Sequence, residues 1–305
     1  MADIASALKV GTYLDGRYRI QNILGSGGFG ITYGAINLTN NQRCAIKEFF
    51  PRQIAVRMND GMTVSPVDQE TVKTYEHGIE RFLEEADALQ TLHNVERVVE
   101  VYDFFQQNGT CYFVMEYLDG MTLRKLAKMN GGTISWDNLK FLIESTGNAL
   151  SQVHAKGIFH RDISPDNIFI CSNFNIKLID FGAAKNDTQN DARTVSVVLK
   201  KGYAPIEQYS AKSIVSPKVD IYAFGATMYY LLTRTMPVPS VDRVINDDLV
   251  EPKKLNPNIS DEWNKVILKC MQIKAEDRYN SAEETFEHLL TNMTVRTRYK
   301  DLIAA

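Results

Sequence analysis

The hydrophobic pattern changes once along the chain, at residues 119–120, and this change constrains the fold more than any other feature of the sequence. Residues 18–117 contain short β-rich runs separated by glycine and asparagine turns, with one amphipathic helix expected at residues 72–92. Helical segments predominate after residue 120, at 137–155, 220–233, 261–272 and 281–293. The sequence therefore predicts an α+β fold in two lobes, a small β-rich N-terminal lobe with one helix and a larger, mainly α-helical C-terminal lobe.

A glycine-rich loop is expected between two strands of the first lobe. Its sequence is Gly25-Ser26-Gly27-Gly28-Phe29-Gly30. Glycines without side chains let backbone N–H groups approach phosphate oxygens closely. A dinucleotide site with this pattern needs a helix directly after the last glycine, but residues 31–38 are typical of a strand. We therefore expect a glycine hairpin that can bind phosphate.

Lys47 lies in the next expected strand, seventeen residues after the loop. A lysine in that place can bind the α- and β-phosphates of a nucleotide if a carboxylate holds its ammonium group in position. Glu84 and Glu85, neighbours on the expected helix, are the two candidates for this carboxylate. A single lysine or glutamate is ordinarily a solvated surface charge, so these residues indicate a nucleotide site only in combination with other motifs.

Two polar segments in the second half of the chain carry the residue types that phosphoryl transfer requires. They are His160-Arg161-Asp162-Ile163-Ser164-Pro165-Asp166-Asn167 and Ile179-Asp180-Phe181-Gly182. An in-line attack needs a carboxylate that faces the acceptor hydroxyl, and oxygen ligands for the metal ion that neutralises the phosphates. The segments resemble the H-R-D-x-x-x-x-N and D-F-G elements of the eukaryotic-like, Hanks-type serine/threonine protein kinase family, and GYAPIEQY at 202–209 resembles its bacterial members. The ordered match runs from about residue 18 to residue 290.

The resemblance implies an enzyme, an ATP-dependent protein kinase that phosphorylates serine and threonine hydroxyls of protein substrates. It would use Mg²⁺, with Mn²⁺ as an alternative ion. Asp162 would be the catalytic base, and Asn167 and Asp180 would bind the metal. His160 and Phe181 are expected to pack against and align the two loops rather than to act chemically.

The resemblance also implies where the nucleotide binds. Lys47 would pair with Glu85, because Glu85-Ala86 matches the helix pattern of the family. Ala45 and Phe169 would sandwich the adenine ring. The residues expected to contact ATP are Gly25, Ser26, Gly27, Gly28, Phe29, Gly30, Thr32, Ala45, Lys47, Met115, Glu116, Leu118 and Phe169.

The match implies a division of the chain. The parts are an N-terminal extension at 1–17, an N-lobe at 18–114 with an insertion at about 49–69, a hinge at 115–118, a C-lobe at 119–292 and a C-terminal tail at 293–305. The insertion explains why Lys47 and Glu85 are 38 residues apart. Two interpretations are open. The insertion is a surface for regulation or for a partner, or it is a surface loop without function, since long insertions cost little loop entropy.

The activation segment implied by the family runs from Asp180 to Glu207. It ends in the sequence APIE at 204–207, which resembles the A-P-E element, whose glutamate pairs with a buried arginine. Arg278 is in the matching place. Asp220, at the start of an apolar helix, resembles the aspartate that braces the catalytic loop of the family.

Regulation by autophosphorylation is a hypothesis that rests on basic residues near this segment. In the family, residues corresponding to Arg161 and Lys185 contact a phosphate on the activation segment. Thr188, Thr194 and Ser196 are the candidate acceptors.

The sequence departs from the family pattern at four places. Ser164 stands where most serine/threonine kinases have a lysine, so a positive charge near the transferred phosphoryl group is missing. Lys200 or Lys201 is in place to reach back and restore it, although either is equally compatible with a peptide contact or a plain surface charge. Asp166 occupies the position of a tyrosine-kinase arginine, so the substitution at Ser164 does not make this a tyrosine kinase. Thr32 replaces a nearly isosteric valine. The fourth departure is the insertion.

Composition excludes other classes of function. The formal net charge of −3 offers no field that attracts nucleic acid. The first residues lack a secretory signal, and no apolar run reaches the roughly 20 residues of a membrane span. Four isolated cysteines favour a reducing, cytoplasmic compartment.

Two alternatives to an active protein kinase are weighed. One is a nucleotide-binding pseudokinase or scaffold, for which Ser164 is the main argument. The other is a small-molecule kinase of the aminoglycoside or choline type, against which Arg161 and the 204–207 element argue.

Overall fold

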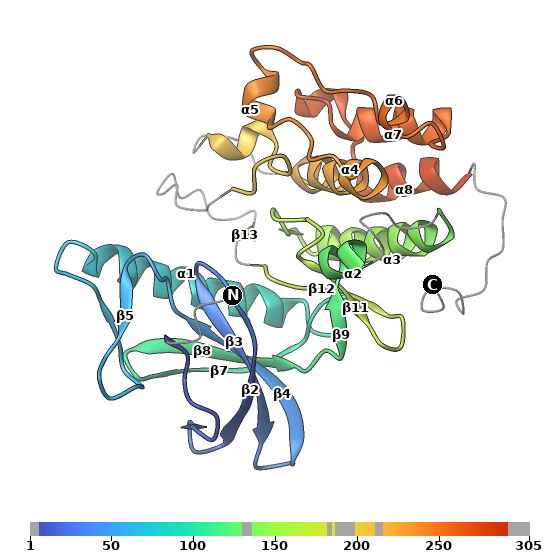
Figure 1. The fold of residues 1–305 in the computed structure, drawn as a ribbon. Helices are drawn as coiled ribbons and strands as arrows, with labels where there is room; N and C mark the ends of the chain where they lie inside the picture. The colour runs from blue at the N-terminus through green and yellow to red at the C-terminus, as the bar shows by residue number, and fades with distance from the viewer. Residues whose placement is uncertain (1–5, 130–135, 182–184, 187–198, 211–215, 292–305) are drawn as a thin grey trace. The chain divides into compact units, whose positions relative to one another are not determined.

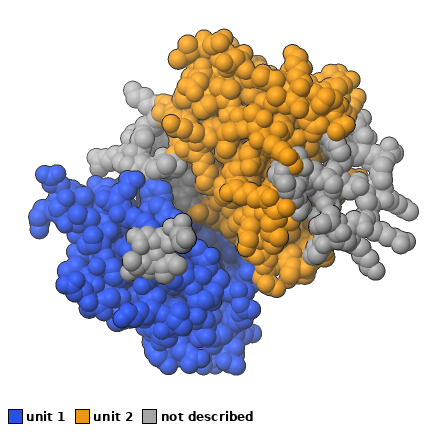
Figure 2. Space-filling model, in the orientation of Figure 1, with its two compact units in different colours: residues 1–94, 99–118 blue, residues 95–98, 119–305 orange. Residues whose placement is uncertain are grey.

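The structure is a computed structural model, and it describes residues 6–129, 136–181, 185–186, 199–210 and 216–291. The chain forms two compact units, coloured separately in Figure 2. Unit 1 comprises residues 1–94 and 99–118, and unit 2 comprises residues 95–98 and 119–305. Unit 1 is built on a β-sheet and unit 2 is mainly helical (Figure 1), which confirms the predicted α+β fold.

Unit 1 contains a six-stranded antiparallel sheet with the strand order β1-β2-β3-β4-β8-β7. The strands are β1 Tyr13–Leu14, β2 Tyr18–Ser26, β3 Gly30–Asn37, β4 Gln42–Phe49, β7 Val101–Gln107 and β8 Thr110–Glu116. Along β3, Ile31 and Tyr33 are fully buried whereas Thr32 between them is not. Because side chains on a strand alternate between the two faces, this pattern places one face of the sheet in the core of unit 1.

The helix α1, Val72–Thr91, packs on this sheet through aromatic side chains. The ring of Phe82 lies 4.9 Å from that of Phe113 on β8 and 5.6 Å from that of Phe49 at the end of β4. Gly78 permits the close approach, since a Cβ atom there would lie 2.5 Å from the ring of Phe49. The helix occupies the range that its hydrophobic periodicity predicts.

The insertion after β4 forms a hairpin of β5 Ala55–Arg57 and β6 Val64–Pro66. Its Arg57 binds Glu48, with Nη1–Oε1 and Nη2–Oε2 distances of 2.9 and 2.6 Å. Glu48 is fully buried and also accepts hydrogen bonds from the hydroxyls of Tyr33 and Tyr112, each at 2.7 Å. Burial and the adjacent Glu48 carboxylate raise the pKa of both tyrosines, so they remain donors. The insertion therefore contributes to the core of unit 1 and is more than a surface excursion.

Substitution of Arg57 by alanine is expected to lower the free energy of unfolding by about 2–3 kcal/mol, because Glu48 would stay buried without its cation. The two tyrosine hydroxyls would still donate to it, which limits the loss. Urea denaturation measures the change. Arg17→Ala is the control, since the bridges of Arg17 to Asp15 and Asp103 are partly exposed and worth about 1 kcal/mol or less. Equal losses in the two variants would show that the insertion is not part of the core.

Unit 2 is organised around α4, Lys218–Thr233, in which every residue from 219 to 229 is buried. A helix that is apolar on all sides belongs in the interior of a domain. The other helices are α2 Leu123–Met129, α3 Trp136–Ala155, α5 Ser240–Arg243, α6 Pro252–Leu255, α7 Asp261–Cys270 and α8 Ala282–Thr291. Helix α4 contacts α7, and α3 contacts α8. None of the helices in the described residues is both long and apolar enough to cross a membrane.

Short strands in unit 2 frame the loops that carry the polar motifs. They are β9 Gly120–Thr122, β10 Ile158–Phe159, β11 Ile168–Cys171, β12 Ile176–Leu178 and β13 Lys185–Asn186, and the 3-10 helices are Ile206–Tyr209 and Ala275–Asp277. The order of the three-stranded sheet is β12-β11-β9, and β10 pairs with β13. The segment 160–167 thus connects β10 to β11, and residues 179–181 directly follow β12.

Candidate active site

Lys47 on β4 and Glu85 on α1 form an ion pair within unit 1. The ammonium group of Lys47 lies 2.8 Å from Oε1 and 3.1 Å from Oε2 of Glu85. The Glu85 side chain is only 4% exposed, whereas Glu84 is exposed to solvent. The ring of Phe113 lies 5.3 Å from the same ammonium group and limits water on one side. Glu85, which the family resemblance favours over Glu84, is thus the residue that holds the lysine.

The glycine-rich loop connects β2 to β3 and is fastened at its second half. The backbone N–H of Gly27 donates to the carbonyl of Gly30 at 2.9 Å. The N–H groups of Phe50 and Arg52 donate to the carbonyls of Phe29 and Gly28, at 2.9 and 3.1 Å, and the guanidinium group of Arg52 donates to Ser26 Oγ. A Cβ atom at Gly25, Gly27 or Gly28 would meet nothing within 4 Å, so this backbone is open to a ligand.

Several residues expected around adenine also lie in unit 1. In the antiparallel register, Thr32 on β3 is opposite Lys47 on β4, and Ala45 on β4 is opposite Met115 on β8. Oε1 of Glu116 accepts from the backbone N–H of Glu100, the residue before β7, at 2.9 Å. Leu118 follows at the end of unit 1, and Phe169 is on β11 in unit 2.

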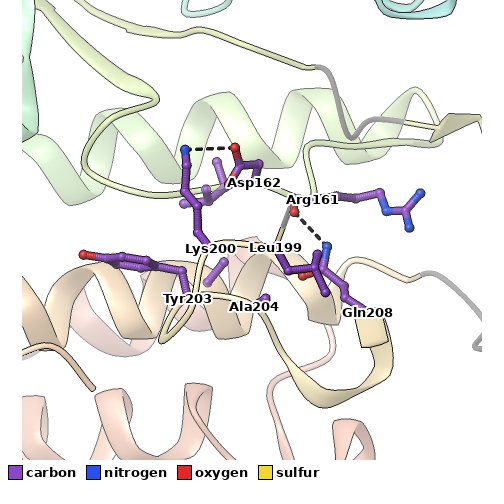
Figure 3. A pocket seen from close by; sticks show the side chains of 9 residues that line it. Arg161, Asp162, Leu199, Lys200, Tyr203, Ala204 and Gln208 are labelled. Atoms are coloured by element: carbon purple, nitrogen blue, oxygen red, sulfur yellow. Dashed lines mark hydrogen bonds and ion pairs between the residues drawn. The ribbon is translucent and has the colours of Figure 1, made fainter. Parts of the chain in front are cut away.

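The carboxylate of Asp162, in the loop after β10, is held by two side chains of unit 2. Asn167 Nδ2 donates both to the backbone carbonyl and to Oδ2 of Asp162, each at 2.7 Å. The ammonium group of Lys200 lies 2.9 Å from the same Oδ2 and 3.1 Å from Ser164 Oγ; Figure 3 shows the contact with Asp162. Burial raises the pKa of Asp162, and the positive charge of Lys200 opposes that shift. The carboxylate is thus fixed in orientation and partly shielded from water.

The oxygen donors beside this carboxylate suit a magnesium ion. Because Asn167 Nδ2 donates to two oxygens of Asp162, the amide oxygen of Asn167 remains a donor to a cation. The segment of Asp180 is tied to this residue, since the N–H of Ile179 donates to the carbonyl of Asn167 at 3.0 Å. Mg²⁺ commonly takes one or two protein carboxylates and completes its shell with phosphates and water. The described residues contain no cluster of three or more His, Cys, Asp or Glu side chains arranged for a metal.

Asp220, in the first turn of α4, holds the 160–167 loop through two backbone N–H groups. Its Oδ2 accepts from the backbone N–H of His160 at 2.9 Å, and its Oδ1 accepts from that of Arg161 at 2.6 Å. Burial alone would raise the pKa of Asp220, but hydrogen bonds from His154 and the backbone outweigh it and lower the pKa. Arg161 and Asp180 have φ values of +64° and +65°, which are uncommon for residues other than glycine.

His160 has a packing role in the structure. Its ring is fully buried and lies 4.3 Å from the ring of Phe181. Nε2 donates to the carbonyl of Ile179 at 3.1 Å, and Nδ1 accepts from the N–H of Asp162 at 3.3 Å. Burial lowers the pKa of His160, so the ring is neutral and links the two loops.

Glu207 and Arg278 form the expected pair at the end of the activation segment. The two N–O distances are 2.5 and 3.0 Å, and Arg278 is 2% exposed. The guanidinium group also donates to three backbone carbonyls, those of Lys218, Gln272 and Ile273. The sequence motif thus marks a buried anchor that joins the segment to the body of unit 2.

Sequence reasoning missed Arg124, which fastens the catalytic loop from α2. Its guanidinium group lies 3.1 Å from Asp166 Oδ2 and donates to the hydroxyl of Tyr203 at 3.1 Å, while its backbone N–H donates to the carbonyl of Pro165 at 2.8 Å. Nothing in the spacing of these residues signals the contact, because Arg124 is 42 residues before Asp166.

The candidate phosphorylation sites Thr188, Thr194 and Ser196 lie outside the described residues. So does Gly182 of the second motif, and only the backbone of Lys185 is described.

The comparisons with known proteins agree with this geometry. The family model described as protein kinase domain matches residues 18–291. A probable serine/threonine-protein kinase of Clostridium acetobutylicum is 31% identical over 286 residues, which cover 92% of this chain and 40% of that protein. Serine/threonine-protein kinase D of Synechocystis is 31% identical over 284 residues, 90% of this chain and 52% of that protein. Serine/threonine-protein kinase PrkC of Bacillus subtilis is 28% identical over 281 residues, 90% and 40% respectively.

A solved structure has the same fold. The chain described as PpkA-294, apo form, superposes with a TM-score of 0.83 at 32% sequence identity, covering 93% of this chain and 99% of that one. By contrast, the present chain spans only 40% to 52% of the length of the three relatives above.

Proposed function

Because the chain belongs to the protein kinase family, of the bacterial Hanks type, we propose that it transfers the γ-phosphoryl group of ATP to serine and threonine hydroxyls of proteins. The observation that carries the proposal is the fixed Asp162 carboxylate, with Asn167 bound to it at 2.7 Å and Lys200 at 2.9 Å. Protein kinases use a divalent metal with ATP, and we propose Mg²⁺, with Mn²⁺ as a substitute.

Each residue has a role that its surroundings support. Asp162 would accept the proton of the attacking hydroxyl, which its fixed orientation favours. Asn167 and Asp180 would hold the metal ion, whose charge lowers the repulsion between the phosphates and the incoming oxygen. Lys47, held by Glu85, would orient the α- and β-phosphates. The open backbone of residues 25–30 would cover the phosphates, and adenine would bind near Ala45, Met115 and the backbone of the proposed hinge at 115–118, with Thr32, Glu116, Leu118 and Phe169 around it.

The test is the transfer of labelled γ-phosphate from ATP, with Mg²⁺ or Mn²⁺, to a generic protein substrate and to the protein itself. Acid hydrolysis then identifies the labelled amino acid. We expect phosphoserine and phosphothreonine with either ion. Binding of ATP without any transfer would instead indicate the pseudokinase, and label on choline or an aminoglycoside but not on protein would indicate a small-molecule kinase.

Nothing in the described residues favours the pseudokinase. Lys47, Glu85, Asp162, Asn167 and Asp180 are all present, and the first four are in hydrogen-bonded pairs. The pair of Glu207 and Arg278 at the end of the activation segment also supports a protein kinase over a small-molecule kinase.

Autophosphorylation of the activation segment is expected at Thr188, Thr194 or Ser196. Mass spectrometry after long incubation with ATP measures it, and the Asp162→Asn variant supplies the background. Phosphate on any of the three residues in the unsubstituted protein only is the expected result. If all three stay unmodified while an added substrate is labelled, this form of regulation is excluded.

We propose a reducing, cytoplasmic location from the cysteines. Cys44, Cys111 and Cys270 are buried as free thiols, and burial raises the pKa of the Cys44 thiol to about 11 and of the Cys111 thiol to about 12. Thiols of this kind are unreactive and pack as small apolar groups.

A further inference from the structure

Lys200 lies beside the catalytic loop, close to the position at which this loop has no lysine of its own. Ser164 stands two residues after Asp162, at the position where most serine/threonine kinases have a lysine, and its side chain is fully buried. The ammonium group of Lys200 lies 3.1 Å from Ser164 Oγ and 2.9 Å from Asp162 Oδ2. A positive charge is therefore present beside the base, but it comes from a segment 36 residues further along the chain.

The backbone around Lys200 is held in a fixed turn. Its carbonyl accepts from the N–H groups of Tyr203 and Ala204, at 3.0 and 3.1 Å. Gly202 has a φ of +86°, and a Cβ atom there would lie 2.9 Å from the carbonyl oxygen of Pro237, so only glycine fits. Ser240 Oγ donates to the carbonyl of Ala204 at 2.8 Å and ties the turn to α5. These bonds fix the point from which the Lys200 side chain extends.

The 3-10 helix that follows this turn is also joined to the catalytic loop. Gln208 Nε2 donates to the carbonyl of Arg161 at 2.7 Å, and Figure 3 shows this bond beside the one between Lys200 and Asp162. The hollow drawn there is lined by residues of both segments, among them Ile163 and Leu199. The segment that carries Lys200 is thus itself hydrogen-bonded to the loop that carries Asp162.

The ammonium group has capacity for one more acceptor. A lysine carries three N–H donors, and Asp162 and Ser164 take two of them. The side chain of Lys200 is 32% exposed, so the group is reachable from solvent while its two partners hold it in place. A cation fixed in advance beside a reacting phosphoryl group stabilises the charge that develops in transfer.

We propose that Lys200 supplies the positive charge to the transferred phosphoryl group that other kinases of this family place at the position of Ser164. The lysine is therefore contributed by residue 200 instead of residue 164. The small side chain of Ser164 leaves room for the Lys200 ammonium group and accepts a hydrogen bond from it. This inference rests on the proposed kinase activity.

The experiment compares kcat and the KM for ATP in four variants with the unsubstituted protein. Lys200→Ala removes the charge, and Lys201→Ala is the matched control, since Lys201 is the adjacent residue, has the same charge and is exposed. Ser164→Lys places a second ammonium group beside Lys200. The double variant Ser164→Lys/Lys200→Ser returns the lysine to the catalytic loop. Thermal melting and nucleotide binding show that each variant is folded.

For Lys200→Ala we expect kcat to fall by about 10²-fold while the KM for ATP changes by about threefold or less. The kcat of the Lys201→Ala control should stay within about twofold of that of the unsubstituted protein. Ser164→Lys alone should have a lower kcat, because two ammonium groups then repel each other. The kcat of the double variant should recover to within about tenfold of that of the unsubstituted protein. Recovery in the double variant separates a role of the charge from a purely structural one.

Other outcomes would overturn the inference. A kcat of Lys200→Ala equal to or above that of the unsubstituted protein would show that Lys200 does not act in transfer, or that it restrains the base. A loss that the double variant does not recover would assign Lys200 to folding of the turn. If the unsubstituted protein itself transfers no phosphate, the proposed function fails and the inference fails with it.

Discussion

The Asp162→Asn variant is expected to bind ATP normally and to transfer its phosphate about 10³-fold more slowly than the unsubstituted protein. Asparagine has the size of aspartate but cannot accept the proton of the attacking hydroxyl. The loop should keep its shape, because Asn167 also donates to the backbone carbonyl of residue 162, and because Asp220 holds the two preceding N–H groups.

Steady-state kinetics with a protein substrate and ATP titration measure the two quantities. Asp248→Asn removes an equal charge from an exposed site in unit 2 and should leave the rate unchanged. If Asp162→Asn retained more than about a tenth of the activity, Asp162 would not be the base. If it lost ATP binding as well, its role would be structural.

The Arg278→Ala variant is expected to lose about 3–5 kcal/mol of stability, the largest loss among the ion pairs described. The substitution would leave Glu207 without its partner and would free three backbone carbonyls that the guanidinium group now binds. Because the arginine is 2% exposed, water does not replace these bonds without opening the structure.

Chemical denaturation measures this loss. Lys253→Ala is the control, since its bridge to Asp261 is exposed and should be worth about 1 kcal/mol or less. Arg278→Lys should be nearly as unstable as the alanine variant, because lysine cannot bind a carboxylate in two places at once. If Arg278→Ala lowered the free energy of unfolding no more than the control does, the pair of Glu207 and Arg278 would not be important for the stability of the fold.

Local patterns in the sequence are sufficient to predict the lobes, the helix α1 and the motifs, because these depend on neighbours along the chain. The choice between Glu84 and Glu85 is different. Adjacent residues on a helix point about 100° apart, and periodicity alone does not decide which of these two is buried, so the preference for Glu85 comes from the family resemblance. Here the structure buries Glu85 and exposes Glu84.

The pairs of Lys47 with Glu85 and of Glu207 with Arg278 are expected from the family resemblance, but other contacts between distant residues could not be predicted from the sequence. Arg57 lies in a polar insertion and looks like a surface charge, yet it enters the core to bind Glu48. Arg124 reaches Asp166 across 42 residues. For the missing catalytic-loop charge, the sequence left two adjacent lysines open, and only the turn at 200–204 shows that Lys200 faces Asp162 while Lys201 faces solvent.

The bond pattern of Asp220 has a consequence for how unit 2 opens. The amide hydrogens of His160 and Arg161 are both held by one fully buried carboxylate on α4. Such hydrogens exchange with deuterium only when the groups that hold them separate. Deuterium exchange at these two amides therefore reports the separation of the catalytic loop from the first turn of α4.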